Sequence, residues 1–408
     1  MAQILNCRLC DGSDLQIVWN LEDSPYGDLF QQSKSSALQI PFQSLTLALC
    51  ANCSLLQITE ITDIEQQYDQ YLYNSTTTHG LGKFYSHTVD RLISDFSLIT
   101  DDLILDIGSN DGSFLVNFKE KGFEVLGVEP AEMSSKTARN RGVNTLQAYF
   151  DSNIVTQILN KHKYPKLISI NYTLANVPNV RLFLTLISEL MDENSILSII
   201  TGYHPDQFVV NMFDYVGHDH LSYFTIESID FICKLLGLKI LDVSRAEHKG
   251  GSVQILIART KHKLDPQPSV SQMIQRERWL GTRFSSFYQV LKVRIEEAVT
   301  LVKQILDSQD FKYLNGIGAS ISTTYFCNQF SISEKLFALF DDDVNKIGRF
   351  SPGAGLEVFP LSALPSGGKY LTIVLAWQHT DKLLSRLKEI NFTGRVLVPL
   401  PSPRLIVI

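Results

Sequence analysis

The sequence predicts an α/β protein with a small four-cysteine module at its N-terminus, followed by two Rossmann-like domains. Two Cys-x-x-Cys pairs open the chain, a glycine-containing turn follows a buried strand near residue 107, and a second such turn lies near residue 316. A chain of 408 residues is too long for one ordinary hydrophobic core. We place the domains at residues 1–62, 63–262 and 263–408.

Composition and charge limit the classes of partner. The formal net charge of −7 gives no global field that would attract nucleic acid or anionic lipid. The chain has no basic start followed by a long apolar run, and no stretch of about 18 apolar residues. We therefore expect a cytoplasmic protein, monomer or homodimer, that binds neither nucleic acid nor membrane.

Cys7, Cys10, Cys50 and Cys53 form two pairs whose spacing suits one tetrahedral Zn(II) bound by four thiolates. Each Cys-x-x-Cys turn presents two sulfurs on the same side, and a metal closes the loop between the turns. A shell of four cysteines leaves no open position, so we expect a structural site. Free thiols or a redox pair are the alternatives, and iron is the competing metal.

Alternating strands and helices predict that residues 63–262 form a doubly wound parallel sheet. Helical stretches such as 133–141 and 180–191 separate the strands, and the last two apolar runs would be the final pair. The apolar runs that have the character of buried strands are 103–107, 125–128, 167–170, 196–200, 240–243 and 253–258.

The turn after the first of these strands reads Asp106-Ile107-Gly108-Ser109-Asn110-Asp111-Gly112. It departs from the dinucleotide pattern G-x-G-x-x-G, because asparagine and serine occupy the second and third glycine positions. It resembles instead the first motif of S-adenosylmethionine-dependent methyltransferases, D-x-G-x-x-x-G. Gly108 and Gly112 would let the backbone pass close to the cofactor. Asp106, with Asn110 or Asp111, would contact its cationic amino-acid end.

Glu129 and Pro130 follow the next strand. A carboxylate at this strand end can accept hydrogen bonds from both ribose hydroxyls, as the acidic residue does in dinucleotide-binding folds. The glycine motif and Glu129 together predict S-adenosylmethionine as the cofactor and a Rossmann-like class I methyltransferase domain. The alternative is a structural glycine turn with a solvated aspartate.

The last third of the chain predicts a second Rossmann-like unit behind a long helix. Residues 261–270 contain two prolines and basic residues, which is typical of a linker. Residues 271–307 carry apolar side chains at helical spacing without proline, so we expect one helix. A strand then enters the glycine turn at 313–318, and the three aspartates at 341–343 follow another apolar run. We expect one of these carboxylates at a ligand edge rather than a metal site.

These features together resemble the sugar C-methyltransferases, which act on nucleotide-linked 4-keto-deoxysugars. The resemblance covers the four-cysteine start, LDIGSNDGSFL and GVEPA, and in the tail GIGA, KIGRFSPG and LAW. It implies a zinc-binding domain, a methyltransferase domain and a C-terminal Rossmann-like domain that helps to hold the sugar nucleotide. The implied reaction removes the C3 proton next to the C4 carbonyl, and the enolate attacks the sulfonium methyl without a catalytic metal.

The same resemblance implies the catalytic residues. The family has Tyr-His-Glu-His where this chain has Gly217-His218-Asp219-His220, so His220 is the expected base, with Asp219 and His218 beside it. Tyr71 and Tyr73 match tyrosines of a substrate-side loop.

Two further positions depart from the family. Asn176 replaces a histidine that would be catalytic, and Lys249 stands where the family has histidine before Gly-Gly-Ser, with His248 one place earlier.

The leading hypothesis is C-methylation of a nucleotide-activated keto sugar. The changes at Asn176 and Gly217 motivate a second hypothesis, a paralogue that methylates another sugar or atom. A third is a catalytically silent binding subunit on the same fold. The intact cofactor motif argues against silence, and binding of S-adenosylmethionine followed by turnover with a panel of keto sugar nucleotides would discriminate among the three.

Overall fold

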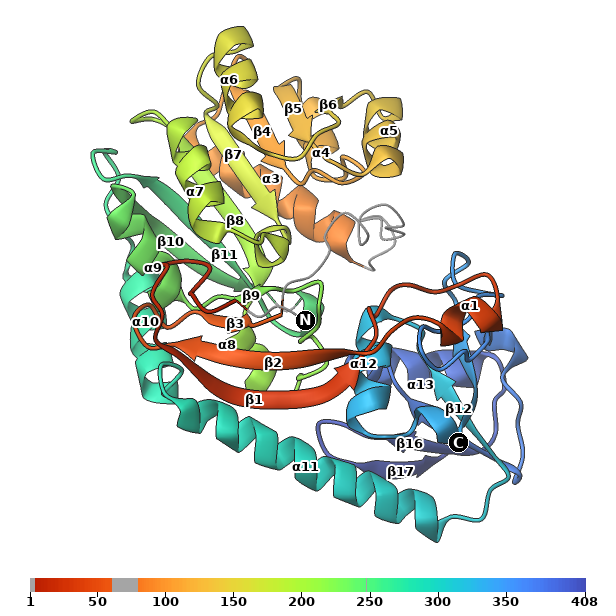
Figure 1. Cartoon of the computed structure of the whole chain (residues 1–408). Coiled ribbons are helices and arrows are strands. Elements are labelled where there is room, and N and C mark those ends of the chain that lie inside the picture. The colour runs from red at the N-terminus through yellow and green to blue at the C-terminus, as the bar shows by residue number, and fades with distance from the viewer. Residues whose placement is uncertain (1–3, 61–79, 247) are drawn as a thin grey trace.

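The computed structural model describes residues 4–60, 80–246 and 248–408. It contains three β-sheets, arranged in Figure 1 with the seven-stranded sheet at one end and the six-stranded C-terminal sheet at the other. The N-terminal strands β1 (Leu15–Ser24) and β2 (Gln43–Cys50) run between them. The three-part α/β architecture predicted from the sequence is confirmed.

The central sheet has the strand order β10-β11-β8-β7-β4-β5-β6. The strands from β6 to β8 are parallel, and β11 is antiparallel to both β8 and β10. The direction of winding changes at β4, which has β5 on one side and β7 on the other; this is where open α/β sheets bind ligands. The strands are β4 (Leu103–Ile107), β5 (Glu124–Val128), β6 (Asn144–Leu146), β7 (Leu167–Asn171), β8 (Ile196–Gly202), β10 (Leu238–Ala246) and β11 (Ser252–Arg259).

Helices cover both faces of this sheet because its strands are apolar on both sides. Leu103 and Leu105 on β4 face one buried cluster, whereas Ile104 between them faces the other. One face packs against α6 (Ser152–Lys161), α7 (Val180–Glu189) and α9 (Ile226–Leu235). The other packs against α3 (Leu81–Phe96), α4 (Leu115–Lys119) and α5 (Glu132–Asn140). The short α8 (His204–Val209) follows β8.

The N-terminal sheet includes a strand that the sequence did not predict. β1, β2 and β3 (Leu56–Ile58) form an antiparallel meander, with the short α1 (Lys34–Leu38) between β1 and β2. β3 then pairs with β9 (Ser222–Tyr223), which belongs to the central part of the sequence. This pairing attaches the segment just after His220 to the N-terminal module.

The C-terminal sheet has the order β14-β13-β12-β15-β16-β17, parallel except for its last strand. The second Rossmann-like unit is thus present. Helices α12 (Ile321–Gln329) and α13 (Thr380–Glu389) pack in separate buried clusters. The strands are β12 (Tyr313–Ile317), β13 (Leu336–Asp341), β14 (Val358–Pro360), β15 (Tyr370–Val374), β16 (Arg395–Val398) and β17 (Arg404–Val407).

The expectation of one helix over 271–307 is wrong. Two helices, α10 (Pro268–Leu280) and α11 (Ser285–Ser308), occupy this region. Gly281 ends α10 with a φ of 75°, a left-handed conformation that favours glycine and terminates helices. Pro268 is the first residue of α10, where a proline needs no hydrogen-bonded N–H, so the linker is shorter than expected.

The four-cysteine module has no separate core among the described residues. Cys7, Cys50 and Leu55 belong to the buried cluster under the central sheet. Val18 and Leu47 instead pack in one cluster with α11 and the C-terminal sheet. The N-terminal residues therefore join the other two parts, and the domain boundaries at 62 and 262 stay a prediction.

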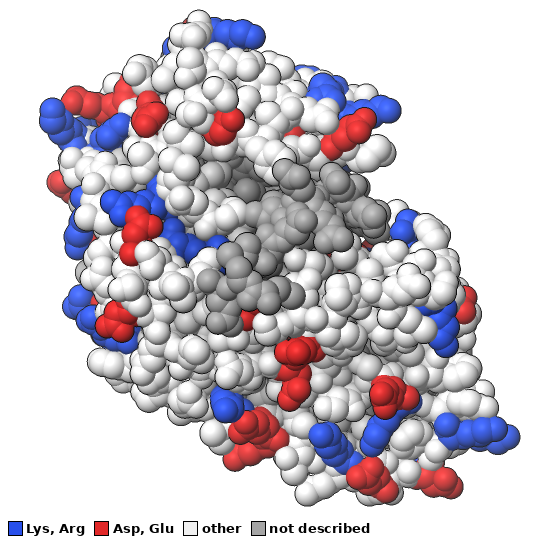
Figure 2. Space-filling model, in the orientation of Figure 1, with Lys and Arg blue, Asp and Glu red and all other residues white. Residues whose placement is uncertain are grey.

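The face that Figure 2 shows has a mixed charge distribution, as expected for a chain with no strong global field. Basic and acidic side chains are interspersed over this face, and neither sign forms a large patch. Across the described ranges, every helix is too short or too polar to cross a membrane.

Candidate functional site

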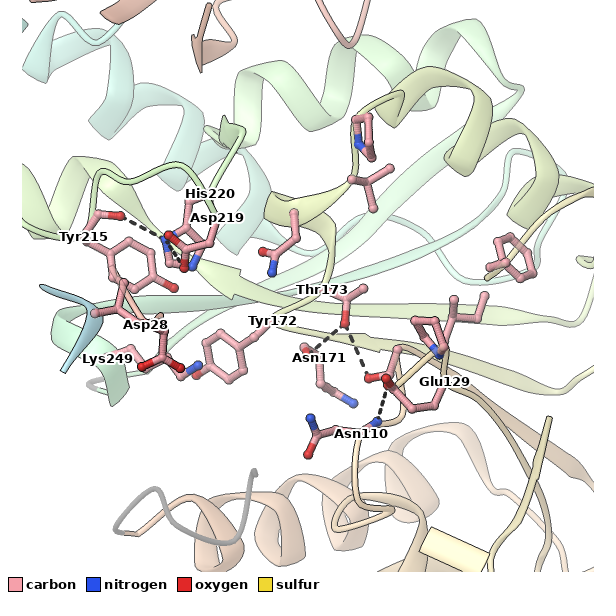
Figure 3. Close-up of a pocket in the computed structure, with 18 of the residues that line it drawn as sticks. Asp28, Asn110, Glu129, Asn171, Tyr172, Thr173, Tyr215, Asp219, His220 and Lys249 are labelled. Carbon is pink, nitrogen blue, oxygen red and sulfur yellow. Dashed lines mark hydrogen bonds and ion pairs between the residues drawn. The ribbon is translucent and has the colours of Figure 1, made fainter. Parts of the chain in front are cut away.

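A cavity of about 410 Å³ lies where the three parts of the chain meet. The carboxyl ends of β4, β5 and β7 form one wall, and the segment 214–220 and residues 320–322 of the C-terminal domain form others. Figure 3 shows two groups of polar side chains, one around Glu129 and one around His220, that face this space.

Glu129 stands at the end of β5 and is only 4% exposed. One carboxylate oxygen accepts a hydrogen bond from the backbone N–H of Asn110 and the other from that of Ala131, both at 2.9 Å. Each oxygen keeps a lone pair for a hydroxyl donor. Burial raises the pKa of Glu129 above its ordinary value, although the two backbone donors oppose this. The ribose-binding role of Glu129 stays a prediction.

An apolar wall adjoins Glu129. Val128, Ala148, Phe150 and Phe183 line this part of the cavity, and the Phe150 and Phe183 rings meet edge to face with centroids 5.3 Å apart. Such a wall suits a flat aromatic base next to a ribose.

Asp106 does not line the cavity, contrary to the expectation that it contacts the cofactor. It is 1% exposed, and one of its oxygens accepts hydrogen bonds from Ser169 Oγ at 2.6 Å and Asn171 Nδ2 at 3.1 Å. Burial raises its pKa to about 7. Because the Asn171 amide nitrogen is held by Asp106, its Oδ1 is fixed in place as the acceptor. This buried oxygen, on a residue that lines the cavity, has no hydrogen-bond partner in the described part of the chain and suits an ammonium group.

Some residues of the glycine turn line the cavity, and others pack behind it. Gly108 and Asn110 line the cavity, as does Pro130. Gly108 has a φ of 72°, and a Cβ there would lie 2.2 Å from Thr173 Oγ1, so only glycine fits. Gly112 also has a positive φ, but it packs against Ala138 of α5.

Asp111 is fully buried, 3.3 Å from the Arg141 guanidinium. The structure therefore places Asp111, like Asp106 and Gly112, behind the cofactor wall. The side chains of Asp106 and Asp111 point into the protein interior, where they are buried, and they support the shape of the turn.

His220 lies on the second wall, and its ring stacks on Tyr215 with centroids 4.2 Å apart. Its Nδ1 is 3.0 Å from the backbone oxygen of Tyr215. A carbonyl can only accept, so Nδ1 carries the hydrogen and Nε2 of the neutral ring keeps a lone pair. Asp219 Oδ2 is 3.7 Å from the same Nδ1. His220 thus has the tautomer that a general base requires.

The other predicted catalytic residues separate into three groups. Asp219 and Asn176 line the cavity with His220. His218 does not: it is fully buried, and its Nε2 is 2.9 Å from the backbone oxygen of Ser44. His218 thus points away from the cavity that Asp219 and His220 line, so its expected catalytic place is not supported. Tyr71 and Tyr73 lie outside the described residues.

Sequence reasoning missed several residues of the second wall. Tyr172, Tyr215 and Lys249 line it, and Lys249 Nζ lies 4.1 Å from the centre of the Tyr172 ring. Lys249 has a φ of 54°, which is uncommon for a residue other than glycine, and its carbonyl accepts a hydrogen bond from Gln207 Nε2 at 3.0 Å. In the sequence, the signal for Lys249 was that it stands where the family has histidine. No signal in the sequence pointed to Tyr172 or Tyr215.

The C-terminal domain reaches the cavity through its own glycine turn. Asp341, at the end of β13, accepts a hydrogen bond from the backbone N–H of Ala319 at 2.6 Å, much as Glu129 accepts from Asn110. Ser320 and Ser322 follow this turn and line the cavity.

Two side-chain contacts tie this domain to the rest of the cavity wall. Asp214 accepts hydrogen bonds from Trp377 Nε1 at 2.9 Å and from Gln378 Nε2, and its burial raises its pKa to about 7. Lys346 and Asp28 form an ion pair of 2.9 Å that joins the C-terminal domain to the N-terminal module.

The four cysteines come together as predicted, with all sulfurs within 4.8 Å of one another. Cys7 and Cys53 sulfurs are 3.5 Å apart, and those of Cys10 and Cys50 are 3.6 Å apart. Tetrahedral Zn–S bonds of about 2.3 Å place neighbouring sulfurs roughly 3.8 Å apart, so the cluster fits zinc. No other such group of His, Cys, Asp or Glu side chains occurs in the described ranges.

Three protein-family profiles match consecutive parts of the chain. They are a zinc-binding domain over residues 7–68, a methyltransferase domain over 79–243 and a C-methyltransferase C-terminal domain over 247–401. A curated relative, C-methyltransferase NovU of Streptomyces niveus, is 24% identical over 405 residues, which cover 98% of this chain and 96% of the relative.

Solved structures resemble part of the chain. An S-adenosylmethionine-dependent methyltransferase from Archaeoglobus fulgidus has a TM-score of 0.38 and 19% identity, over 47% of this chain and all of that one. Magnesium protoporphyrin IX methyltransferase from Synechocystis, with bound S-adenosylhomocysteine, has a TM-score of 0.36 and 12% identity, over 49% of this chain and 88% of that one.

Proposed function

Because the chain belongs to the S-adenosylmethionine-dependent C-methyltransferases that carry an N-terminal zinc-binding domain, we propose that it methylates C3 of a nucleotide-linked 4-keto-deoxysugar. The observation that carries this proposal is the single cavity shared by the cofactor wall, His220 and the second glycine turn. A donor held at Glu129 and Asn171 and an acceptor held by the C-terminal domain would meet in front of His220.

The chain's own residues would hold the cofactor at three points. Glu129 accepts from the ribose hydroxyls, Asn171 Oδ1 accepts from the ammonium group, and the wall around Phe150 covers the base. When bound, S-adenosylmethionine supplies a methyl group on a positively charged sulfur, which a carbon nucleophile can attack.

His220 would generate that nucleophile. Its Nε2 takes the proton from C3, and the bonding electron pair moves into the C4 carbonyl oxygen to give an enolate. C3 would then form the new bond to the methyl carbon, and the electron pair of the broken C–S bond would stay on sulfur. The proton remains on His220, whose Nδ1–H is held by the Tyr215 carbonyl at 3.0 Å.

The enolate oxygen needs a positively charged or hydrogen-bonding group, and we assign this role to Lys249. Lys249 and Lys346 both line the cavity, and Lys346 pairs with Asp28 of the N-terminal module at 2.9 Å. Lys249 projects from a left-handed turn toward Tyr172 and the His220 side of the cavity (Figure 3).

The C-terminal glycine turn would hold the nucleotide. Asp341 shapes this turn by binding the Ala319 N–H, and Ser320 and Ser322 present hydroxyl groups to the cavity. Hydroxyl donors and the start of a helix are groups that bind phosphate oxygens. A negative chain can therefore bind an anionic sugar nucleotide locally.

The test has two parts. The purified protein should bind S-adenosylmethionine, and a panel of 4-keto sugar nucleotides in D₂O should reveal one whose C3 hydrogen exchanges without the methyl donor and is replaced by methyl with it. Cofactor binding without exchange or methylation of any keto sugar would overturn the sugar assignment. Methylation at oxygen, nitrogen or another carbon would favour the second hypothesis, a paralogue with a different target. That hypothesis is motivated by Asn176, which replaces a histidine of the family.

A further inference from the structure

The zinc-binding turn contacts the cavity wall through one buried side chain. Arg8 lies between the ligands Cys7 and Cys10, and it is only 9% exposed. A guanidinium keeps its positive charge throughout the physiological pH range. A buried cation at this position requires acceptors, and the structure supplies backbone carbonyls from two separate segments.

The guanidinium spans those two segments. Its NH1 donates to the carbonyl of Pro178 at 3.2 Å, and its NH2 donates to the carbonyls of Glu60 at 2.9 Å and Ile58 at 3.5 Å. The backbone N–H of Arg8 donates to Gln57 Oε1 at 2.9 Å. Arg8 therefore fixes the distance between the end of β3 and the turn that ends at Pro178.

Both segments lead directly to the reacting groups. Asn176, Val177 and Pro178 line the cavity. The N–H of Leu221, next to His220, donates to the carbonyl of Ala175 at 2.7 Å, and the carbonyl of Leu221 accepts from the N–H of Ile58 at 3.1 Å. The segment before Pro178, the end of β3 and the residue after His220 are thus linked in a closed ring of hydrogen bonds that Arg8 completes.

We infer that Arg8 is a positioning residue, which transmits the geometry of the four-cysteine site to the cavity segments that carry Asn176 and His220. A shift of about 1 Å between reacting groups can lower a rate about 10²-fold, so the ring has kinetic consequences without touching substrate. The inference rests on the proposed function only for its kinetic test, because the hydrogen-bonded ring exists whatever the substrate.

Arg8→Met tests the inference by keeping an unbranched apolar stem and removing the guanidinium, with its charge and donors. We expect unchanged zinc content, S-adenosylmethionine affinity within about twofold, and a kcat about 10²-fold lower with a smaller change in KM. Hydrogen–deuterium exchange of amides in 174–177 and 219–223 should become about tenfold faster, while amides of β12 (Tyr313–Ile317) stay unchanged.

Arg8→Lys is the conservative variant, and Arg181→Ala is the matched control. Lysine keeps the charge but lacks the planar fork that reaches both segments, so it should restore kcat only in part. Arg181, at the start of α7 just after Pro178, joins this segment to the zinc-binding turn through an ion pair with Asp11 at 2.6 Å, but its side chain is 45% exposed. Loss of this surface pair should leave kcat and amide exchange near wild type.

Three results would overturn the inference. One is wild-type kcat and amide exchange in Arg8→Met. Another is a fall of kcat in Arg8→Met that parallels its loss of zinc, while zinc-loaded Arg8→Lys has the kcat of wild type. The third is equal damage in Arg181→Ala, because then the interface as a whole is responsible. If wild type shows no turnover with any keto sugar, the proposed function fails, and the exchange measurement alone decides the role of Arg8.

Discussion

Replacing Glu129 by alanine is the sharpest test of the cofactor wall. The carboxylate is 4% exposed, and the N–H groups of Asn110 and Ala131 hold both of its oxygens at 2.9 Å. Two lone pairs remain for the two ribose hydroxyls of S-adenosylmethionine. Glu129→Ala removes both acceptors, and it also leaves two backbone donors without their partner.

The magnitude follows from these bonds. A hydrogen bond to a charged group contributes about 1.5–3 kcal/mol, and water entering the space left by the side chain replaces part of each. A net loss of about 1.4–2.8 kcal/mol corresponds to a dissociation constant about tenfold to a hundredfold higher. Glu129→Gln should be only partly better, because its amide nitrogen would face a backbone N–H donor.

Titration calorimetry with S-adenosylmethionine measures the change, and thermal unfolding confirms that each variant is folded. Glu124→Ala is the matched control, since Glu124 begins the same strand but its side chain is 51% exposed and pairs with His162. Wild type should bind a cofactor analogue that lacks the ribose 2′-hydroxyl more weakly than it binds the natural cofactor. Glu129→Ala should bind the analogue and the natural cofactor equally well. A folded Glu129→Ala protein with unchanged affinity would remove Glu129 from the ribose role.

Three further outcomes are expected. We expect elemental analysis to find stoichiometric zinc in wild type, and Cys50→Ser should lose it and leave the N-terminal module poorly folded, because structural zinc contributes to folding. Absence of both zinc and iron from wild type would refute the site. His220→Asn should keep cofactor affinity but lower methyl transfer and C3 proton exchange together by about 10²–10⁴-fold, and exchange at the wild-type rate would show that His220 is not the base. Burial raises the pKa of Asp106 from 3.8 to about 7, so the folded state holds its proton more tightly than the unfolded state, and stability falls as pH rises across this window. Asp106→Asn should flatten that fall by up to about 1.4 kcal/mol per pH unit in denaturant titrations, and an unchanged pH profile would contradict the assigned shift.

The sequence predicted the parts of this protein whose chemistry depends on local spacing. Two Cys-x-x-Cys turns can only present their sulfurs in pairs, and the structure brings the four together. A glycine turn and a strand-end carboxylate are positioned by adjacent parallel strands, so Gly108 and Glu129 face one cavity. The break at Gly281 was not predicted, although glycine is a common residue at a helix end.

Only the tertiary structure decided which side chains act from each wall, because those choices depend on contacts between distant segments. Asp106 accepts a hydrogen bond from the Asn171 amide of the neighbouring strand, so a residue predicted to contact the cofactor instead orients a side chain that lines the cavity. His218 faces Ser44 while His220 faces the cavity. Arg8 reads as an ordinary residue between two ligands until β3, Pro178 and Leu221 are folded around it. Local spacing determined the cofactor and the metal, whereas pairing between segments far apart in the chain determined the geometry of the reacting groups.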